Sequence, residues 1–137
     1  MAKIKLTNLV DSAKARQGLL PSDQVRTLEM EGLVDTGATS LVIPMEVAEA
    51  LGLPEVGRYP VRLADGSVRD FPKVSELHIE ILGRGMICDA IAVPAKTLLI
   101  GQIPLEMLDL VVDPKSRDLA VNPESPDAPM FDAMSAA

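Results

Sequence analysis

The sequence contains very little cysteine and few aromatic residues. Among its 137 residues there is one cysteine, Cys88, and aromatic side chains make up 2% of the chain. A single cysteine excludes an intramolecular disulfide and agrees with a reducing compartment, so we expect a cytoplasmic protein. Since aromatic rings are scarce, a core in this chain must be filled by Leu, Ile, Val and Met.

The sequence also has fewer basic than acidic residues and contains no long apolar run. Lys and Arg number 13 against 20 Asp and Glu, which gives a net charge of −7. Because nucleic-acid affinity comes largely from Lys and Arg on phosphates, we expect no nucleic-acid partner. No apolar run is long enough to cross a bilayer, no basic amphipathic helix is present, and no apolar stretch follows the first five residues. We therefore expect neither a membrane partner nor a secretory signal.

Motifs that bind metals or phosphates are missing as well. The Asp residues do not have EF-hand spacing, and no Cys/His pattern suits zinc. Gly83-Arg84-Gly85 lacks the remainder of either phosphate-binding glycine motif. His78 falls on the polar side of an alternating segment and is read as a solvated residue, and Cys88 is read as a structural thiol. We expect no cofactor and no metal.

The hydrophobic pattern predicts short strands separated by turn signals. Residues 11–24 are interpreted as a loop, residues 45–51 and 103–109 as short helices, and residues 122–137, with their three prolines, as a poorly ordered tail. This pattern favours an all-β, barrel-like domain over residues 1–121 with one or two short helices. The expected strands are 3–7, 25–34, 58–64, 67–71, 74–82, 86–93, 98–100, 110–112 and 119–121.

Asp65-Gly66 is the clearest hairpin signal. An Asp-Gly pair between two strands is typical of a two-residue turn in which both central residues have positive φ. The segment predicts an exposed hairpin that joins the strands on either side of it.

A second motif could place a catalytic carboxylate. Leu33-Val34-Asp35-Thr36-Gly37-Ala38 occurs once and places a carboxylate, a hydroxyl and a glycine directly after an apolar strand. Two such carboxylates side by side could share a proton and activate a water molecule between them. Because the chain has one copy, the second would have to come from another subunit. By itself, Asp-Thr-Gly is also a common turn after a strand.

Taken with three further segments, this motif resembles the active-site signature of the retropepsin-like aspartic proteases. Asp35-Thr36-Gly37-Ala38 is followed by Leu41-Val42-Ile43-Pro44, then by Leu63-Ala64-Asp65-Gly66-Ser67, which is similar to the tip of a flap hairpin, and then by Leu98-Leu99-Ile100-Gly101. The resemblance runs from about residue 3 to residue 121 and implies a closed barrel that functions as a homodimer.

The resemblance also implies roles for individual residues. Asp35 would be the catalytic carboxylate, Thr36 would hydrogen-bond across the dimer, and Gly37 would offer its N–H to the carboxylate, with Ala38 completing the loop. A flap of Ala64, Asp65, Gly66 and Ser67 would close over a polypeptide substrate. The candidate substrate-binding residues are Leu33, Thr39, Val42, Leu63, Ile100, Gln102 and Ile103.

The sequence departs from the viral members of the family at Thr39 and Gln102. Those positions usually carry Asp and Arg, a charged pair beside the site. Here we expect that a Thr and a Gln could make a neutral hydrogen bond to each other instead.

Two functions are compatible with these residues. The first is an aspartic endopeptidase whose dyad is formed by Asp35 of two subunits; the second is a catalytically silent, dimeric peptide-binding or scaffolding module with the same fold. A third chemistry, phosphoryl transfer through Asp35, would need Mg²⁺ ligands and an alternating β–α pattern, and the sequence shows neither.

Overall fold

The structure is a computed structural model that describes residues 1–131. Strands dominate it, and its helices are short. The elements are β1 (Ala2–Asn8), α1 (Leu9–Arg16), η1 (Ser22–Gln24), β2 (Thr27–Val34), β3 (Leu41–Pro44), α2 (Met45–Ala50), β4 (Glu55–Arg62), β5 (Val68–Ile81), β6 (Arg84–Val93), β7 (Leu98–Ile100), α3 (Gln102–Met107), β8 (Leu110–Val112) and β9 (Leu119–Val121).

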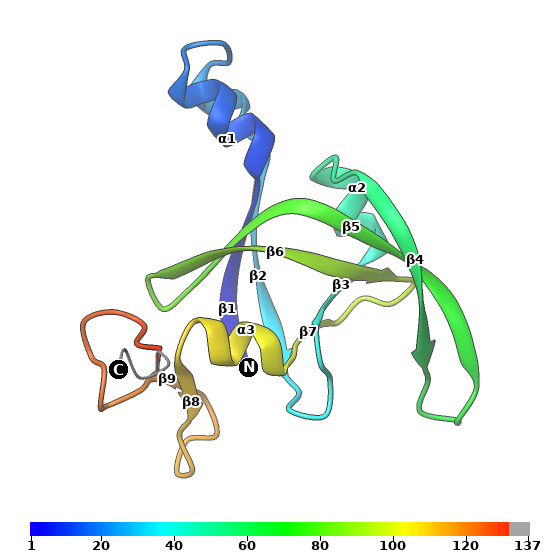
Figure 1. Cartoon of the computed structure of the whole chain (residues 1–137), viewed down its shortest axis with the longest axis vertical. Coiled ribbons are helices and arrows are strands. Elements are labelled where there is room, and N and C mark those ends of the chain that lie inside the picture. Colours follow the sequence, from blue (N-terminus) through cyan, green and yellow to red (C-terminus); the bar gives the residue numbers. More distant parts are fainter. Residues whose placement is uncertain (132–137) are drawn as a thin grey trace, which may run out of the picture.

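Six of the strands close into a barrel. Their order is β1-β2-β7-β3-β6-β5, and β1 pairs with β5 to complete the ring, while β4 continues the sheet from β5 (Figure 1). Most neighbours are antiparallel, but β2–β7 and β3–β6 are parallel. The all-β, closed-barrel prediction is confirmed. The homodimer stays a prediction.

The barrel is filled by aliphatic side chains. Along β1, β5 and β7 alternate residues point inward, which buries Ile4, Leu77 and Leu98 completely. Burying one such side chain contributes about 1.5–3 kcal/mol, so the cluster is the main source of stability. Its other members are Leu6, Leu41, Ile43, Ala48, Leu51, Val74, Ile79, Ile81, Ala90, Ala92, Ile100, Leu105, Leu108, Leu110 and Leu119.

The predicted loop over residues 11–24 is wrong. Most of it is helical: α1 spans Leu9–Arg16, extends away from the barrel in Figure 1, and is followed by η1. Asn8 caps α1, because its Oδ1 accepts a hydrogen bond from the Asp11 N–H at 3.0 Å. The helix has no pronounced apolar face, so the periodicity that reveals most helices is weak in this segment.

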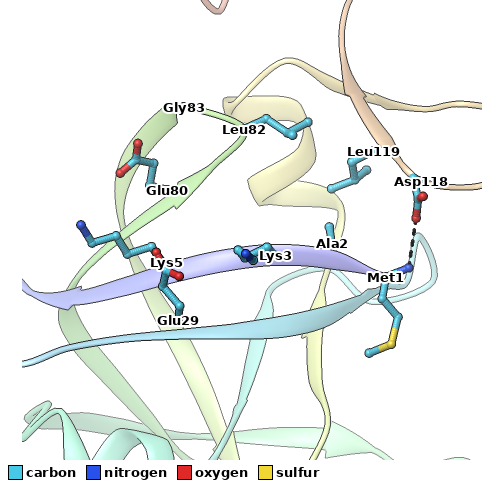
Figure 2. A pocket seen from close by; sticks show the side chains of 10 residues that line it. All are labelled: Met1, Ala2, Lys3, Lys5, Glu29, Glu80, Leu82, Gly83, Asp118 and Leu119. Atoms are coloured by element: carbon cyan, nitrogen blue, oxygen red, sulfur yellow. Dashed lines mark hydrogen bonds and ion pairs between the residues drawn. The ribbon is translucent and has the colours of Figure 1, made fainter.

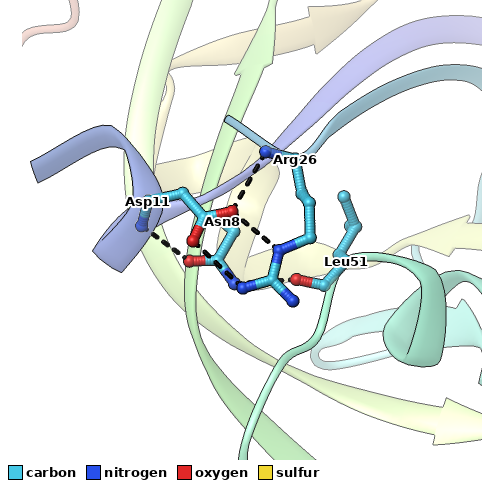
Figure 3. Close-up of polar contacts among 4 residues, drawn as sticks. All are labelled: Asn8, Asp11, Arg26 and Leu51. Carbon is cyan, nitrogen blue, oxygen red and sulfur yellow. Dashed lines mark hydrogen bonds and ion pairs between the residues drawn. The ribbon is translucent and has the colours of Figure 1, made fainter. Parts of the chain in front are cut away.

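A polar cluster joins α1 to β2 and α2 (Figure 3). Arg26 donates from Nε to Asp11 Oδ2 at 2.7 Å and from Nη2 to Asp11 Oδ1 at 3.0 Å. Asn8 Nδ2 donates to the Leu51 carbonyl at 2.7 Å, in a buried position. The hydrogen bond from Arg26 lowers the pKa of the buried Asp11 carboxyl to about 2, although burial itself acts in the opposite direction. The cluster therefore fixes the entry into β2, the strand that leads to Asp35.

Acid should weaken this cluster. Because the folded-state pKa of Asp11 is depressed, its contribution is complete above the unfolded value of about 3.9 and is lost as the pH falls toward 2. We expect Asp11→Asn to lower the free energy of unfolding by about 1–2 kcal/mol at pH 7, since the half-exposed Arg26 is partly screened by solvent. The difference from the wild type should shrink between about pH 4 and pH 2.

Urea unfolding at a series of pH values measures this difference. Asp23→Asn, a change at an exposed position in η1, is the matched control and should leave the free energy of unfolding unchanged. A gap between wild type and Asp11→Asn that stays constant from pH 5 to about pH 2 would contradict the assignment.

β5 is one long strand where two were predicted. Its pairing with β6 shifts register between Val74 and Leu77, and Glu76 there has a φ of 59°. A β-bulge of this kind bends a strand without ending it. The break expected between residues 71 and 74 is wrong, because Pro72 and Lys73 stay paired with β4. The predicted strand at 98–100, the hairpin at 110–112 and 119–121, and the helix beginning at residue 45 are confirmed.

A buried arginine anchors the segment after α3. Arg84, 6% exposed, donates to the carbonyls of Leu108 and Asp109 at 3.1 and 2.9 Å, and also to the carbonyl of Ser125. Asp109 in turn accepts from Asn122 Nδ2 at 3.0 Å. Residues 122–131, part of the tail predicted for 122–137, thus contact the barrel. Residues 132–137 lie outside the described part of the chain. No helix within residues 1–131 is long and apolar enough to cross a membrane.

Candidate active site

Asp35 stands at the end of β2, in a loop that orients its carboxylate. Its N–H donates to the carbonyl of Ile100 in β7 at 3.0 Å, which extends the parallel β2–β7 pairing by one residue. The Gly37 N–H donates to Asp35 Oδ1 at 3.0 Å, and the Ala38 N–H donates to the Asp35 carbonyl at 3.1 Å. The half-buried carboxylate is therefore held by the backbone of its own Asp-Thr-Gly turn.

The far side of this loop rests on the start of α3. The N–H groups of Gln102 and Ile103 donate to the carbonyls of Ala38 and Thr39 at 2.8 and 2.9 Å. Gly101, the residue just before α3, passes very close to the backbone of this loop. A Cβ at Gly101 would lie 2.2 Å from the Ser40 carbonyl oxygen and 2.7 Å from that of Ala38. Only glycine allows this approach of two backbone segments.

A methyl group at residue 101 should displace the loop that carries Asp35. We expect Gly101→Ala to lower the free energy of unfolding by about 1–3 kcal/mol, because backbone carbonyls cannot move aside as a flexible side chain can. Urea unfolding is the measurement. Gly57→Ala is the matched control. A Cβ at Gly57 would meet nothing within 4 Å, so this substitution should leave the free energy of unfolding unchanged. Equal stability of the two variants would show that the approach is not tight.

Four aliphatic residues lie in a row across the barrel next to the Asp35 loop. Leu33 is in register with Leu99, Leu99 with Val42, and Val42 with Ile91. Leu33 is 45% exposed and the other three are half-buried, so the row is open to solvent on the face opposite the core. We call these residues the apolar row. Leu33 and Val42 are among the predicted substrate-binding residues, and Leu99 and Ile91, which lie in the same row, are not.

The prediction that Ile100 lines a substrate pocket is wrong in this structure. Its side chain is fully buried in the core, and its neighbour Leu99 takes the outward position. Strand alternation within 98–100 was the signal that could have separated the two. The expected hydrogen bond between Thr39 and Gln102 is also absent from the described contacts: Gln102 Nε2 donates to Glu106 Oε1 at 3.1 Å, one helical turn away.

The predicted flap is a hairpin, but its turn is longer than expected. The Leu63 N–H donates to the Ser67 carbonyl at 2.8 Å and the Gly66 N–H to the Leu63 carbonyl at 2.9 Å, which leaves three residues in the loop. Gly66 has a φ of +85°, while Asp65 is not in the left-handed region, so one positive φ suffices. This is the pattern of a type I turn closed by a glycine bulge.

Asp65 stiffens the flap turn. Its Oδ1 accepts from the Ser67 N–H at 2.8 Å and from Ser67 Oγ at 2.5 Å, and these bonds hold the pKa of the Asp65 carboxyl below its usual range. The hairpin of β4 and β5 and the Asp35 loop both point toward the same end of the molecule in Figure 1. Ala64 and Leu63 belong to this turn, and Ile103, 45% exposed, belongs to the α3 side of the site.

Other reactive groups do not assemble into a competing centre in the described residues. Among residues 1–131, no three His, Cys, Asp or Glu side chains come together to hold a metal ion. Burial raises the pKa of the Cys88 thiol to about 12, so it stays protonated at neutral pH and is a poor nucleophile.

A cavity of about 590 Å³ lies elsewhere on the barrel surface (Figure 2). None of the predicted site residues lines it. Lys5 lies between Glu29 and Glu80 in the strand register, and the Met1 ammonium is 3.3 Å from Asp118 Oδ1. Opposite charges on neighbouring strands of an outer barrel face are ordinary surface stabilisation, and we assign no chemistry to this cavity.

A closed barrel with one backbone-held Asp-Thr-Gly loop and one long hairpin is an aspartic-protease type of domain. Residues 24–102 match the protein family described as "gag-polyprotein putative aspartyl protease". Because the match covers more than half of the chain, the chain belongs to this family.

Two solved structures are similar to the chain. The foamy viral protease-reverse transcriptase in complex with double-stranded DNA is 19% identical, with a TM-score of 0.47 over 56% of this chain and 13% of that one. The simian foamy virus (mac) protease in solution is 17% identical, with a TM-score of 0.45 over 56% of this chain and 80% of that one. No curated protein matches the chain.

Proposed function

We propose that the chain is an aspartic endopeptidase that acts as a homodimer, with one Asp35 from each subunit. The observation that carries this proposal is the Asp35 loop. A carboxylate is held at a strand end by the Gly37 N–H, in a chain that belongs to an aspartyl protease family. The motif occurs once in the sequence, so a dyad requires two chains.

The dyad would hydrolyse a peptide bond with an activated water. Two carboxylates a few ångströms apart do not both ionise easily, so they share one proton. The ionised carboxylate takes a proton from the water, whose oxygen attacks the peptide carbonyl carbon, while the protonated one gives its proton to the carbonyl oxygen. Collapse of the intermediate then breaks the C–N bond: the amine leaves with the proton that the first carboxylate took from the water, and a hydroxyl of the intermediate returns a proton to the second carboxylate as the new carboxyl group forms. Thr36, exposed on the loop, would bond to the partner subunit and hold the two loops together.

The substrate would be an extended polypeptide. The apolar row lies open beside the Asp35 loop and offers apolar side chains a surface on which to pack. Each apolar side chain buried there would contribute about 1.5–3 kcal/mol before the costs of binding. The hairpin tip at Ala64, Asp65, Gly66 and Ser67 would close over the peptide and exclude water. A cytoplasmic location remains the expectation drawn from the single cysteine.

Replacing the carboxylate is the direct test. Asp35→Asn keeps the size of the side chain but removes the base, so we expect cleavage of a diverse peptide library to fall by at least about 1000-fold. Asp23→Asn, a change at an exposed position in η1 and outside the Asp35 loop, is the matched control and should cleave as the wild type does. Mass spectrometry of the digests reports cleavage, and sedimentation velocity reports the oligomeric state.

The outcome also separates the enzyme from the silent module. A wild type that cleaves nothing yet dimerises and binds peptides would support the module. Cleavage that survives Asp35→Asn would place the chemistry elsewhere.

Mixing wild type with Asp35→Asn tests whether the two carboxylates come from different chains. If subunits exchange freely, equal amounts give mixed dimers, and about one dimer in four keeps both carboxylates. Total activity should then fall to about half that of the same amount of wild type alone. Activity that is unaffected by the inactive subunit would argue for a site complete within one chain.

A further inference from the structure

Asp109 has an unusual backbone conformation for a residue with a side chain. It is the second residue after α3, and its φ of 53° lies in the left-handed region. Its N–H donates to the Glu106 carbonyl at 3.1 Å and so closes the last turn of the helix. Helices often end in this conformation, but the residue is usually glycine, because a Cβ makes it unfavourable. An aspartate at such a position points to a use of its side chain.

The carboxylate of Asp109 binds the segment that follows β9. Its Oδ1 accepts a hydrogen bond from Asn122 Nδ2 at 3.0 Å, and its Oδ2 accepts from the Met130 N–H at 3.1 Å and from Ser125 Oγ. These bonds, the one from Ser125 first, hold the pKa of the Asp109 carboxyl below its usual range. Asn122 and Met130 thus meet on one side chain, and the chain between them forms a closed loop beside the end of α3 (Figure 1). We call residues 122–131 the C-terminal strap.

The strap is also held by a buried arginine. Ser125 is 4% exposed, and its carbonyl accepts a hydrogen bond from Arg84, whose guanidinium donates to two carbonyls at the end of α3 as well. Prolines at three positions of the strap each fix φ, which reduces the conformational entropy that the strap loses when it closes; they are Pro123, Pro126 and Pro129. The strap is therefore joined to the end of α3 by two charged side chains.

α3 links the strap to the Asp35 loop over a short distance. The helix has six residues and is about 9 Å long. At its start, the N–H groups of Gln102 and Ile103 donate to two carbonyls of the Asp35 loop at 2.8 and 2.9 Å. Both donors belong to the helix backbone, so a displacement of α3 would break both bonds. Whatever holds the end of α3 therefore also holds the loop.

We propose that Asp109 is a positioning residue for the Asp35 loop. With the strap closed on its carboxylate, α3 stays in place and the loop stays ordered; with the strap released, the loop loosens while the barrel remains folded. The strap lies outside residues 24–102, the part of the chain that matches the aspartyl protease family, so the loop depends on a segment that this match does not include. Only the effect on cleavage rests on the proposed function, because the order of the loop is measurable without it.

Residue-resolved amide hydrogen exchange, followed by NMR, tests the proposal. Asp109→Gly removes the carboxylate but suits a left-handed φ, so the backbone at the end of α3 is kept. We expect the amides of Ala38, Gln102 and Ile103 to exchange about tenfold faster than in the wild type, as the loss of one or two net hydrogen-bond contributions predicts. Ser125→Ala removes one of the three donors and should raise the same rates by a smaller factor.

Two controls separate positioning from general destabilisation. Asp113→Gly is the matched substitution: Asp113 accepts from the Lys115 N–H at 2.9 Å in the turn between β8 and β9, and its replacement should leave the loop amides unchanged. Ile79→Val trims a fully buried side chain of β5 and lowers global stability. It should speed exchange only for amides that open with the whole barrel. Urea unfolding of each variant reports the global stability for comparison.

Three results would overturn the proposal. The first is an Asp109→Gly protein whose loop amides exchange as in the wild type. The second is an equal rise in loop and barrel amides, which would make the role of Asp109 a general structural one. The third is a double variant of Asp109→Gly and Ser125→Ala in which the two effects add in full, because two changes at one shared contact should not add.

Cleavage measures the consequence for the proposed protease. Asp109→Gly should lower kcat with little change in KM, because the peptide-binding surface remains while the Asp35 carboxylate is less often in place. Faster loop exchange in a protein that cleaves nothing would support the strap and count against the protease. Peptide cleavage by a protein whose loop exchange is unchanged in Asp109→Gly would support the protease and remove the strap.

Discussion

The close contact between Gly101 and the loop of residues 35–40 is the constraint on which the site depends. It brings the end of β7 and the start of α3 against the backbone after Asp35, so the loop is held by hydrogen bonds from both sides. A carboxylate in such a loop is positioned by main-chain groups and not by flexible side chains. Preorganisation of this kind spares a site the cost of ordering itself when a substrate arrives.

α3 is fixed at both ends by different chemistry. At its first turn, the N–H groups of Gln102 and Ile103 are used by the Asp35 loop. Just beyond its last turn, the carbonyls of Leu108 and Asp109 accept from the buried Arg84, a residue at the first position of β6. Because Arg84 also bonds to the Ser125 carbonyl, the loop, the helix, β6 and the segment after β9 form one connected unit. A groove of about 320 Å³ between β6 and α3 lies within this unit.

The sequence was informative where a local rule applied and misleading where tertiary context decided. The Asp35 loop, the hairpin around Asp65-Gly66 and the strand at 98–100 follow from motif and turn chemistry, which are local. The helix α1 was missed, because its cap at Asn8 and the ion pair between Asp11 and Arg26 carry it in place of an apolar face. Ile100 was misassigned to a pocket, since which of two adjacent aliphatic residues faces the core depends on register with β2 and β3. The groove between β6 and α3 could not be predicted from the sequence, because its lining residues, among them Ser40, Lys73, Ile87 and Ile103, meet only in the folded barrel.

The position of β4 outside the ring has a consequence for behaviour in concentrated solution. In the described residues β4 pairs with β5 along one edge, so its other edge exposes main-chain groups to any strand that approaches. Pro60 supplies no N–H in the middle of that edge, and Glu55, Arg58 and Arg62 place charges along it. Such features discourage edge-to-edge stacking and fibril growth. A long hairpin can therefore project from the barrel without becoming a template for aggregation.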